Sequence, residues 1–190
     1  MDLKIVSINY IDDNTIDKIC DWRNQDFVRT KMFARHIISL KEHRDYIDMV
    51  RKDDKRDMFV LYIDDVPFGV IQYKLYTSGN YVICGNYLIN EADQDKGLGT
   101  MLVFFQNDIV FKYTECNKIY SEVLSYNKAA LSINKKIGGV QEGILRQQVH
   151  MDGKYYDIYC FGLLREEWTA IKNKYEKYIY DSIENSKVIV

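Results

Sequence analysis

Three strand-like runs, joined by two short turns, constrain the fold of this chain more than any other stretch. The runs are residues 58–63, 68–76 and 81–90, and they are rich in valine, isoleucine, tyrosine and other strand-forming residues. An Asp-Asp-Val-Pro turn separates the first two, and Ser-Gly-Asn at residues 78–80 separates the second from the third. Because parallel strands need a crossover of a dozen or more residues, these three runs form an antiparallel meander.

Helical and strand-like patterns surround this meander on both sides. A capping box at residues 39–42 starts a helix that ends near residue 52. Asp152-Gly153 between two alternating runs predicts a further hairpin. The other expected elements are a strand at 3–9, a helix at 15–22, a helix at 97–114 with one apolar stripe (Leu98, Met101, Leu102, Phe105, Ile109, Tyr113), a strand at 119–124, a helix at 128–137, hairpin strands at 142–150 and 155–164, and a final helix at 166–185. The predicted class is α+β, a mixed α/β fold with a mostly antiparallel sheet and helices on both faces.

Charge balance and cysteine spacing narrow the classes of protein to consider. Lys and Arg total 26 against 28 Asp and Glu, a net charge of −2, which argues against general nucleic-acid binding. The four cysteines form no Cys-x-x-Cys pair and none lies at ligand spacing from a histidine, so we expect neither a disulfide framework nor a metal site. The first residues lack a basic segment followed by an apolar one, and no apolar run approaches bilayer length. We therefore expect a cytoplasmic protein without a membrane or nucleic-acid partner.

A glycine-bearing loop, Gln-Asp-Lys-Gly-Leu-Gly-Thr at residues 94–100, joins the last meander strand to the long helix. The first N–H groups of a helix have no intrahelical acceptor, and the helix dipole adds positive potential there. Glycines let the backbone approach a ligand closely, and Lys96 adds a positive charge. This combination predicts an anion site suited to a pyrophosphate.

The spacing within this loop distinguishes it from two other phosphate loops. A Rossmann fingerprint needs a third glycine where Leu102 stands, and a Walker A loop needs Gly-Lys-Ser/Thr. Gln-x-x-Gly-x-Gly after a fourth strand instead resembles motif A of the GCN5-related N-acetyltransferases (GNAT). Residues 127–138 resemble the family's following helix, Asn-x-x-Ala-x-x-x-Tyr-x-x-x-Gly, with Asn134 at the tyrosine position.

The resemblance implies a GNAT domain over residues 1–165, a twisted sheet with strands four and five splayed apart, and acetyl-CoA as cofactor. It implies that the pantetheine arm pairs with strand four inside the gap, and that a primary amine attacks the thioester directly. A strand N–H would then donate to the developing oxyanion. The residues that the resemblance assigns to the cofactor are Tyr87, Leu88, Ile89, Gln94, Asp95, Lys96, Gly97, Leu98, Gly99, Thr100, Asn127, Ala130 and Asn134.

Proton transfer is the step that these motifs leave open. Glu122 lies on the strand facing the implied gap and is our candidate general base, directly or through water, with Glu91 as the runner-up and His36 as a weaker candidate. A solvated or salt-bridged strand glutamate is the alternative for Glu122. Asn134 replaces the family's usual acid; its amide can hydrogen-bond to a thiolate but cannot protonate it. His43, on the capping-box helix, is expected to be solvated.

Two segments, residues 21–29 and 142–168, resemble one branch of the family. That branch contains ribosomal-protein N-terminal acetyltransferases and the pseudaminic-acid-pathway enzyme that acetylates the 4-amino group of a UDP-linked sugar. By this resemblance Trp22 stacks on a flat ring, and Arg23 and Arg29 bind a diphosphate. The alternatives are that Trp22 only anchors the first helix in the core and that Arg29 forms a surface ion pair. The expected acceptor is therefore a nucleotide-linked amino sugar. A protein N-terminus or a polyamine is one alternative, and a CoA-binding module without turnover is another.

Residues 166–190 are expected to form a helical tail of the same domain. An apolar stripe at helical spacing marks this tail. The stripe either covers the sheet or forms the face of a homodimer, and cover is our prediction. Its members are Trp168, Ile171, Tyr175, Tyr178 and Ile179.

Overall fold

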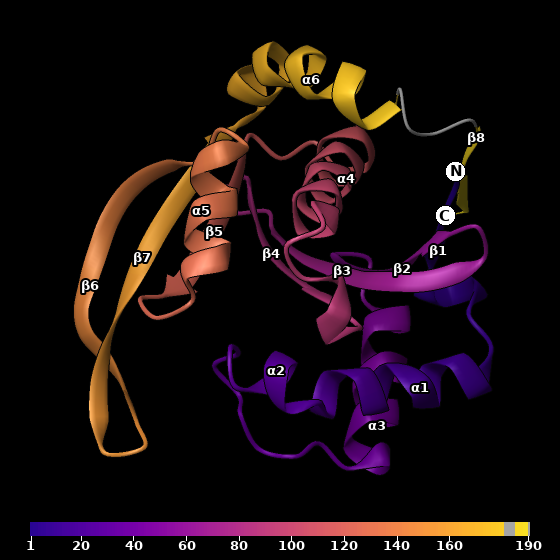
Figure 1. The fold of residues 1–190 in the computed structure, drawn as a ribbon, viewed down its shortest axis with the longest axis horizontal. Coiled ribbons are helices and arrows are strands. Elements are labelled where there is room, and N and C mark those ends of the chain that lie inside the picture. The colour runs from indigo at the N-terminus through magenta and orange to yellow at the C-terminus, as the bar shows by residue number, and fades with distance from the viewer. Residues whose placement is uncertain (181–184, 190) are drawn as a thin grey trace.

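The computed structural model describes residues 1–180 and 185–189, without the side chains of 176–180 and 185–186. Its centre is an eight-stranded sheet in the order β6-β7-β5-β4-β3-β2-β1-β8 (Figure 1). Neighbouring strands are antiparallel except for the pairs β4–β5 and β1–β8, which are parallel. The strands are β1 Asp2–Ser7, β2 Arg56–Ile63, β3 Val66–Tyr76, β4 Tyr81–Leu88, β5 Lys118–Leu124, β6 Val140–Met151, β7 Lys154–Leu164 and β8 Asn185–Ile189.

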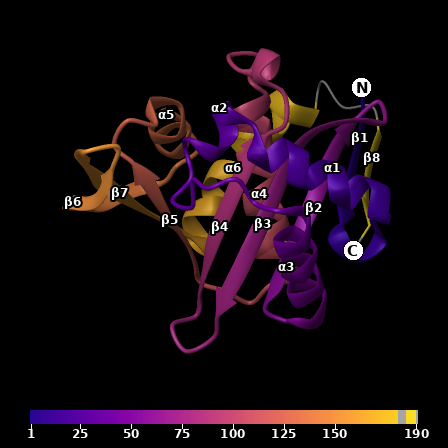
Figure 2. The same cartoon turned by 90° about the horizontal axis from the view of Figure 1, so that it is seen from below.

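Helices cover both faces of this sheet, as Figures 1 and 2 show, which confirms the predicted mixed α/β class. One face carries α1, α2 and α3, of which α1 and α3 pack over β1, β2 and β3 while α2 follows α1 toward the opening between β4 and β5. The other carries α4, α5 and α6. Their bounds are α1 Asp13–Asn24, α2 Asp26–Arg29, α3 Leu40–Lys52, α4 Leu98–Tyr113, α5 Lys128–Lys136 and α6 Arg165–Tyr180, with short 3-10 turns at Ile8–Tyr10 and Glu91–Asp93. No helix in the described part of the chain has both the length and the apolar character to cross a bilayer.

Local turn and cap chemistry places the elements where the sequence predicts them. β2, β3 and β4 form the antiparallel meander. The Ser39 hydroxyl accepts a hydrogen bond from the N–H of Glu42 at 3.2 Å and caps α3. Asp152 and Gly153 both have positive φ, as a two-residue hairpin turn between β6 and β7 requires.

α4 is buried on nearly every side, so the prediction of a single apolar stripe was too narrow. Val103, Phe104 and Val110 lie outside that stripe and are buried, whereas Tyr113, placed within it, is 41% exposed. The reason is that α4 packs against β3 and β4 on one side and against α6 on the other. A helix held between two layers buries more than one stripe.

α6 covers the outer side of α4. Trp168 is 3% exposed, and its ring centroid lies 5.1 Å from that of Phe104. Ile171 and Tyr175 pack against the same core. These contacts give the stripe the covering role predicted for it; the side chains of Tyr178 and Ile179 lie outside the described residues.

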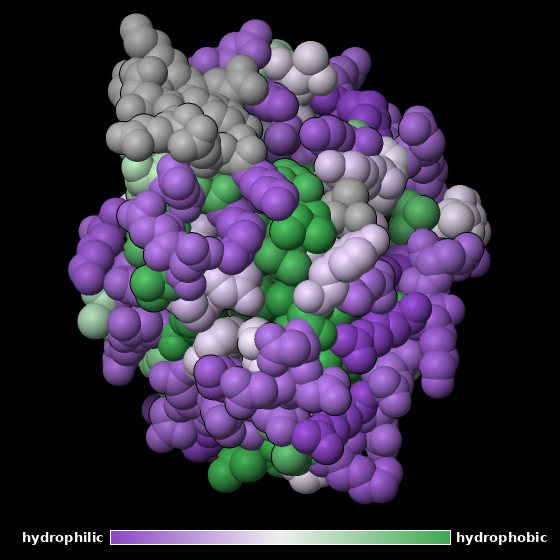
Figure 3. Space-filling view, turned by 90° about the vertical axis from the view of Figure 1, so that its right-hand side faces the viewer, coloured by the Kyte–Doolittle hydropathy of each residue, from purple (hydrophilic) through white to green (hydrophobic). Residues whose placement is uncertain are grey.

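The prediction of a helical tail was wrong for Asn185–Ile189, which form β8. This strand pairs in parallel with β1, with Ile189 opposite Val6. Without it β1 would be an edge strand with unpaired backbone groups, and the β-branched pair Val188 and Ile189 suits a strand better than a helix. Figure 3 looks onto this side of the molecule, where hydrophilic side chains surround a narrow hydrophobic strip.

His43 is buried, contrary to the prediction that it is solvated. It is 4% exposed, and its Nε2 lies 3.0 Å from the carbonyl oxygen of Ile16 on α1. The ring thus ties α3 to α1 across the outer layer. Burial lowers the pKa of His43 from its ordinary value.

We expect acid to destabilise the protein through His43. Because the folded-state pKa is depressed, the unfolded chain binds the proton first; the stabilisation is complete above about pH 6.5 and is lost as the pH falls below that value. His43→Gln should cost about 1–3 kcal/mol at pH 7.5 but show a smaller further loss at pH 5.5. Urea unfolding at both pH values measures this. His36→Gln, at an exposed ring, is the control, and equal pH dependence in His43→Gln and the unsubstituted protein would contradict the role.

Candidate functional site

The sheet opens between β4 and β5. Tyr81, Val82 and Ile83 pair with Lys118, Ile119 and Tyr120. Beyond these pairs β4 stays with β3, and β5 stays with β7. The two strands therefore diverge as expected, and the backbone groups on their inner edges have no partner from the facing strand.

A cavity of about 840 Å³ occupies this opening. Val28 and Met32, from α2 and the loop after it, line the cavity on one face of the sheet. Leu102 of α4 and Ile133 of α5 line it on the other. Because helical layers on opposite faces contribute to one cavity, it passes through the sheet at the divergence.

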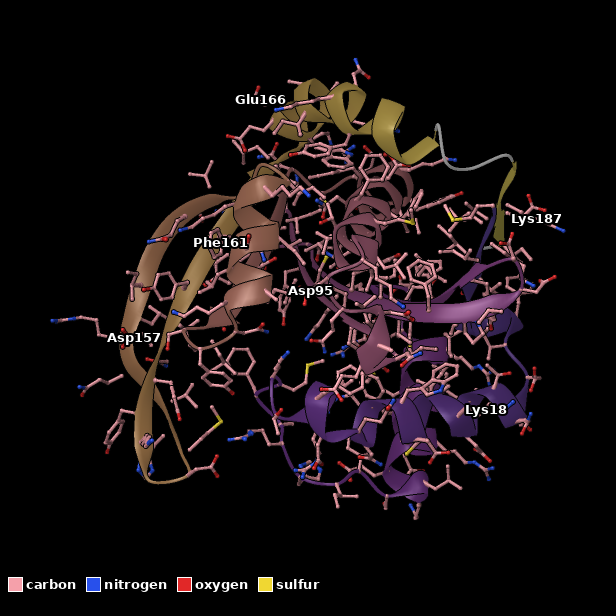
Figure 4. All side chains as sticks on the ribbon, viewed as in Figure 1. Lys18, Asp95, Asp157, Phe161, Glu166 and Lys187 are labelled. Atoms are coloured by element: carbon pink, nitrogen blue, oxygen red, sulfur yellow. The ribbon has the colours of Figure 1, made fainter. Side chains whose placement is uncertain are left out.

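The glycine loop forms one end of this cavity. Gly97 has a left-handed φ of 84° and precedes α4, with the N–H groups of Thr100 and Met101 bonded to its carbonyl at 3.0 and 3.1 Å. The N–H groups of Leu98 and Gly99 come before these bonds and lack helical acceptors, and Gly99 lines the cavity. Figure 4 shows Asp95 between α4 and α5. The loop residues that line the cavity are Gln94, Asp95, Gly97, Gly99 and Thr100.

Two residues of the predicted loop point elsewhere. Lys96 Nζ lies 3.2 Å from a carboxylate oxygen of Asp93 on the exposed side of the turn. Leu98 packs against the core under α4. The positive character of the loop therefore comes from the helix start more than from the Lys96 side chain.

α5 supplies a wall of small and polar side chains. Asn127 caps the helix by accepting a hydrogen bond from the N–H of Ala130 at 3.3 Å, and both residues line the cavity. Asn134 lines it one turn later, and its amide donates one N–H to the Ala130 carbonyl at 2.9 Å. The same amide nitrogen carries a second N–H.

The inner edge of β4 contributes Tyr87 and Leu88 to the cavity. The structure does not bring Ile89 to it. The N–H of Ile89 donates to Phe68 at 3.1 Å, and its carbonyl accepts from the Gln25 side chain at 2.9 Å. Both backbone groups of Ile89 are thus already used within the protein.

Glu122 lines the cavity from β5, on the face opposite α4 and α5. The Tyr120 hydroxyl donates to its carboxylate at 3.0 Å. Burial, together with the neighbouring Cys160 and Glu122, raises the pKa of Tyr120, so the phenol remains a donor. The other candidate bases lie outside the cavity lining: Glu91 in a 3-10 turn, and His36 with its Nε2 2.9 Å from a Glu42 oxygen.

The three residues predicted to recognise the acceptor do not line the cavity. Trp22 packs against the core beneath α1. Arg23 donates to the Ala34 carbonyl at 2.8 Å, and burial lowers its pKa. Arg29 is held by Asp26 at 2.8 Å and donates to the Arg35 carbonyl at 3.0 Å. Both guanidinium groups thus support the loop between α2 and α3.

Sequence reasoning missed several cavity residues. Gln106 and Asn107 are 3% and 2% exposed and line its floor, where Asn86 donates to Gln106 at 2.8 Å. Two adjacent amides inside an otherwise apolar helix were the available signal. The residues on the α2 side carried no such signal; they are Phe27, Val28, Lys31, Met32 and Phe33.

Comparisons with known proteins agree with this geometry. An uncharacterized prophage-derived N-acetyltransferase of Bacillus subtilis (strain 168), YokL, is 32% identical over 85 residues, 44% of this chain and 48% of that protein, so the match spans about half of that relative. The fold is similar to a Vibrio cholerae spermidine N-acetyltransferase in complex with CoA and spermine, with a TM-score of 0.80, 18% identity, and 88% and 98% of the two chains covered. It is also similar to the RimL ribosomal L7/L12 alpha-N-protein acetyltransferase in complex with CoA, with a TM-score of 0.70, 13% identity, and 81% and 90% covered. The family model of the acetyltransferase (GNAT) family matches residues 16–138, more than half of the sequence, and the chain belongs to that family.

Proposed function

We propose that this protein is an acetyl-CoA-dependent N-acetyltransferase that transfers the acetyl group directly to a primary amine. The observation that carries the proposal is the cavity through the sheet, which joins the glycine loop on one face to Glu122 on the other. A donor and an acceptor that enter from opposite faces would meet where β4 and β5 diverge. Membership of the acetyltransferase family supports the same reading.

The residues on the α4 and α5 side fit the cofactor. The first turn of α4, with Gly97 and Gly99, suits a pyrophosphate. The unpaired inner edge of β4 at Leu88 suits the amide groups of a pantetheine arm, with Tyr87 lining the cavity beside it and Asn127 offering a polar wall. Acetyl-CoA supplies the activated thioester when bound.

Three groups of the protein would then take part in the transfer: a base, an oxyanion donor and a donor to the leaving sulfur. Glu122 removes a proton from the amine, directly or through one water. An N–H on the inner edge of β4 donates to the carbonyl oxygen as charge develops on it. Asn134 offers its second N–H to the departing sulfur. Orientation of amine and thioester in one cavity supplies much of the rate.

Asn134→Ala should lower kcat by less than about tenfold, because the amide only orients the leaving group and CoA thiolate needs little acid help near pH 8. Asn134→Tyr should raise kcat below that pH, where protonation of the sulfur matters more. Steady-state rates from pH 6 to 9, with acetyl-CoA affinity measured separately, check both. Complete loss of turnover in Asn134→Ala with acetyl-CoA still bound would show that the amide is essential.

For the acceptor, we propose a nucleotide-linked amino sugar. Among the described residues, the charged side chains lining the cavity are Lys31, Arg56, Lys74 and Lys136 against Asp95 and Glu122. A polyamine needs a cluster of carboxylates, whereas a diphosphate needs cationic donors. A polyamine and a protein N-terminus remain the alternatives, in line with the activities named for the two structural neighbours.

Release of CoA against three amines decides among these acceptors. We expect a UDP-linked 4-amino sugar to give a higher kcat/KM than spermidine or a short peptide. Faster turnover of spermidine or the peptide would overturn the acceptor and leave the acetyltransferase proposal standing. Binding of acetyl-CoA without turnover of any amine would favour a CoA-binding module.

A further inference from the structure

The sheet face on the α3 side carries a group of aromatic and cationic side chains, here called the tyrosine shelf: Arg56, Lys74, Tyr76, Tyr81 and Tyr120. They come from β2, β3, β4 and β5. Figure 2 shows β3 running past α3 to the turn into β4 with no helix across it. Arg56, Lys74 and Tyr76 line the cavity described above. The shelf is therefore part of the same site and reaches its outer rim.

The tyrosines of the shelf present flat surfaces. The rings of Tyr76 and Tyr81 are parallel to within 4°, with centroids 5.0 Å apart. Tyr120 stands edge-on to Tyr81 at 6.4 Å and 82°. The Lys74 ammonium lies 4.6 Å from the Tyr76 centroid. The Tyr76 ring thus has Tyr81 against one face and the Lys74 ammonium over it, so the half-exposed edges of these rings are what a planar ligand ring can contact.

The charges of the shelf are not balanced. Arg56 and Lys74 are directly opposite each other on β2 and β3 and point to the same face, an arrangement that is unfavourable for like charges. Asp53 pairs with Arg56 at 2.8 Å. Within the described part of the chain no carboxylate pairs with Lys74. An anion beside Lys74 would relieve this repulsion.

The shelf leads directly to the point where β4 and β5 diverge. Ile83 pairs with Tyr120 at the last contact between the strands. The Tyr120 hydroxyl donates to Glu122 just beyond it. The four-residue step along β4 from Tyr81 to Gly85 spans about 13 Å, because a strand rises about 3.3 Å per residue. A nucleoside joined to a sugar through a diphosphate can bridge such a span.

We propose that the tyrosine shelf binds the nucleotide end of the acceptor, with its planar ring against the exposed edges of Tyr76 and Tyr81 and a phosphate on Lys74, beside the Arg56–Asp53 pair. The amino group then lies at Glu122. This inference rests on the proposed function and moves acceptor recognition away from Trp22, Arg23 and Arg29, which the cavity does not reach.

Calorimetric titration of UDP and of uridine into protein saturated with CoA tests the shelf, since CoA blocks any nucleotide binding at the glycine loop. We expect Lys74→Gln to weaken UDP at least tenfold and to leave uridine affinity unchanged. Tyr76→Leu should weaken both ligands. Lys112→Gln is the matched control, because Lys112 also lies over a tyrosine ring, at 5.3 Å from the Tyr113 centroid, but away from the cavity.

Failure of UDP to bind at millimolar concentration, or equal losses in Lys74→Gln and Lys112→Gln, would overturn the shelf. Lys74 is half-exposed, so this variant keeps the test decisive even if Tyr76→Leu does not fold. Measurements of acetyl-CoA binding, and of CoA release with the three amines, test the proposed function separately from this inference. If the protein acetylates an amine but does not bind UDP, only the inference about the tyrosine shelf is contradicted. If it does not bind acetyl-CoA, the proposed function itself is contradicted.

Discussion

Replacing Gly97 with valine should weaken acetyl-CoA binding by a hundredfold or more, about 2.7 kcal/mol, while the protein stays folded. Gly97 has a φ of 84°, and its added Cβ would meet no protein atom within 4 Å. The new side chain would thus stand in open space at the loop that lines the cavity. A β-branched residue also resists this backbone conformation, so the loop would lose its approach to a pyrophosphate. Isothermal calorimetry with acetyl-CoA gives the affinity.

Gly153→Val provides the matched control for backbone strain. Gly153 has a φ of 73°, its added Cβ would also meet nothing within 4 Å, and it lies in the turn between β6 and β7. Both variants bear the same kind of strain, but only one lies at the glycine loop. We expect Gly153→Val to keep acetyl-CoA affinity. Unchanged acetyl-CoA affinity in a folded Gly97→Val protein would contradict the placement of the pyrophosphate at this loop.

Glu122→Gln should lower kcat about a hundredfold with little change in acetyl-CoA affinity. The amide keeps the size of the carboxylate and still accepts the hydrogen bond from Tyr120, so the loss reports proton transfer. The deficit should shrink as the pH rises, because more of the amine is then deprotonated in solution. The pH profile of kcat/KM from 7 to 10 measures this trend.

Glu91→Gln serves as the comparison for Glu122→Gln. Glu91 lies in the 3-10 turn before the glycine loop and does not line the cavity. We expect its variant to keep the kcat of the unsubstituted protein. If Glu91→Gln lowered kcat and Glu122→Gln did not, Glu91 would be the base in place of Glu122. If the deficit in Glu122→Gln were the same at all pH values, Glu122 would have only a structural role.

The predictions that agree with the structure depend on short-range chemistry. Ser39 caps α3 through a residue three positions away, and Asp152-Gly153 forces a two-residue turn. The glycine loop lies at a helix start because its own residues favour one. Such signals operate within one element, so a single sequence carries them in full.

The differences arise where distant segments decide the outcome. Residues 185–189 become a strand because β1, at the other end of the chain, offers an open edge. His43 is buried because α1 lies over it. Arg23 and Arg29 look like phosphate ligands in the sequence, but Arg29 donates to Asp26 and to the Arg35 carbonyl, and Arg23 donates its Nη2 to the Ala34 carbonyl while its Nη1 is buried without a partner among the described residues. Lys74 and Arg56 become neighbours only through the register of β2 and β3.

The short contact between β4 and β5 divides the sheet into two panels. One panel holds β8, β1, β2, β3 and β4, and the other holds β5, β7 and β6. Three residue pairs join them along the strands that the structure describes. The two panels are therefore joined along the sheet by little more than one short parallel ladder, and elsewhere by the helices packed on them. A molecule bound in the opening between β4 and α5 would touch both panels at once, so its binding would itself help to hold the two halves of the sheet together.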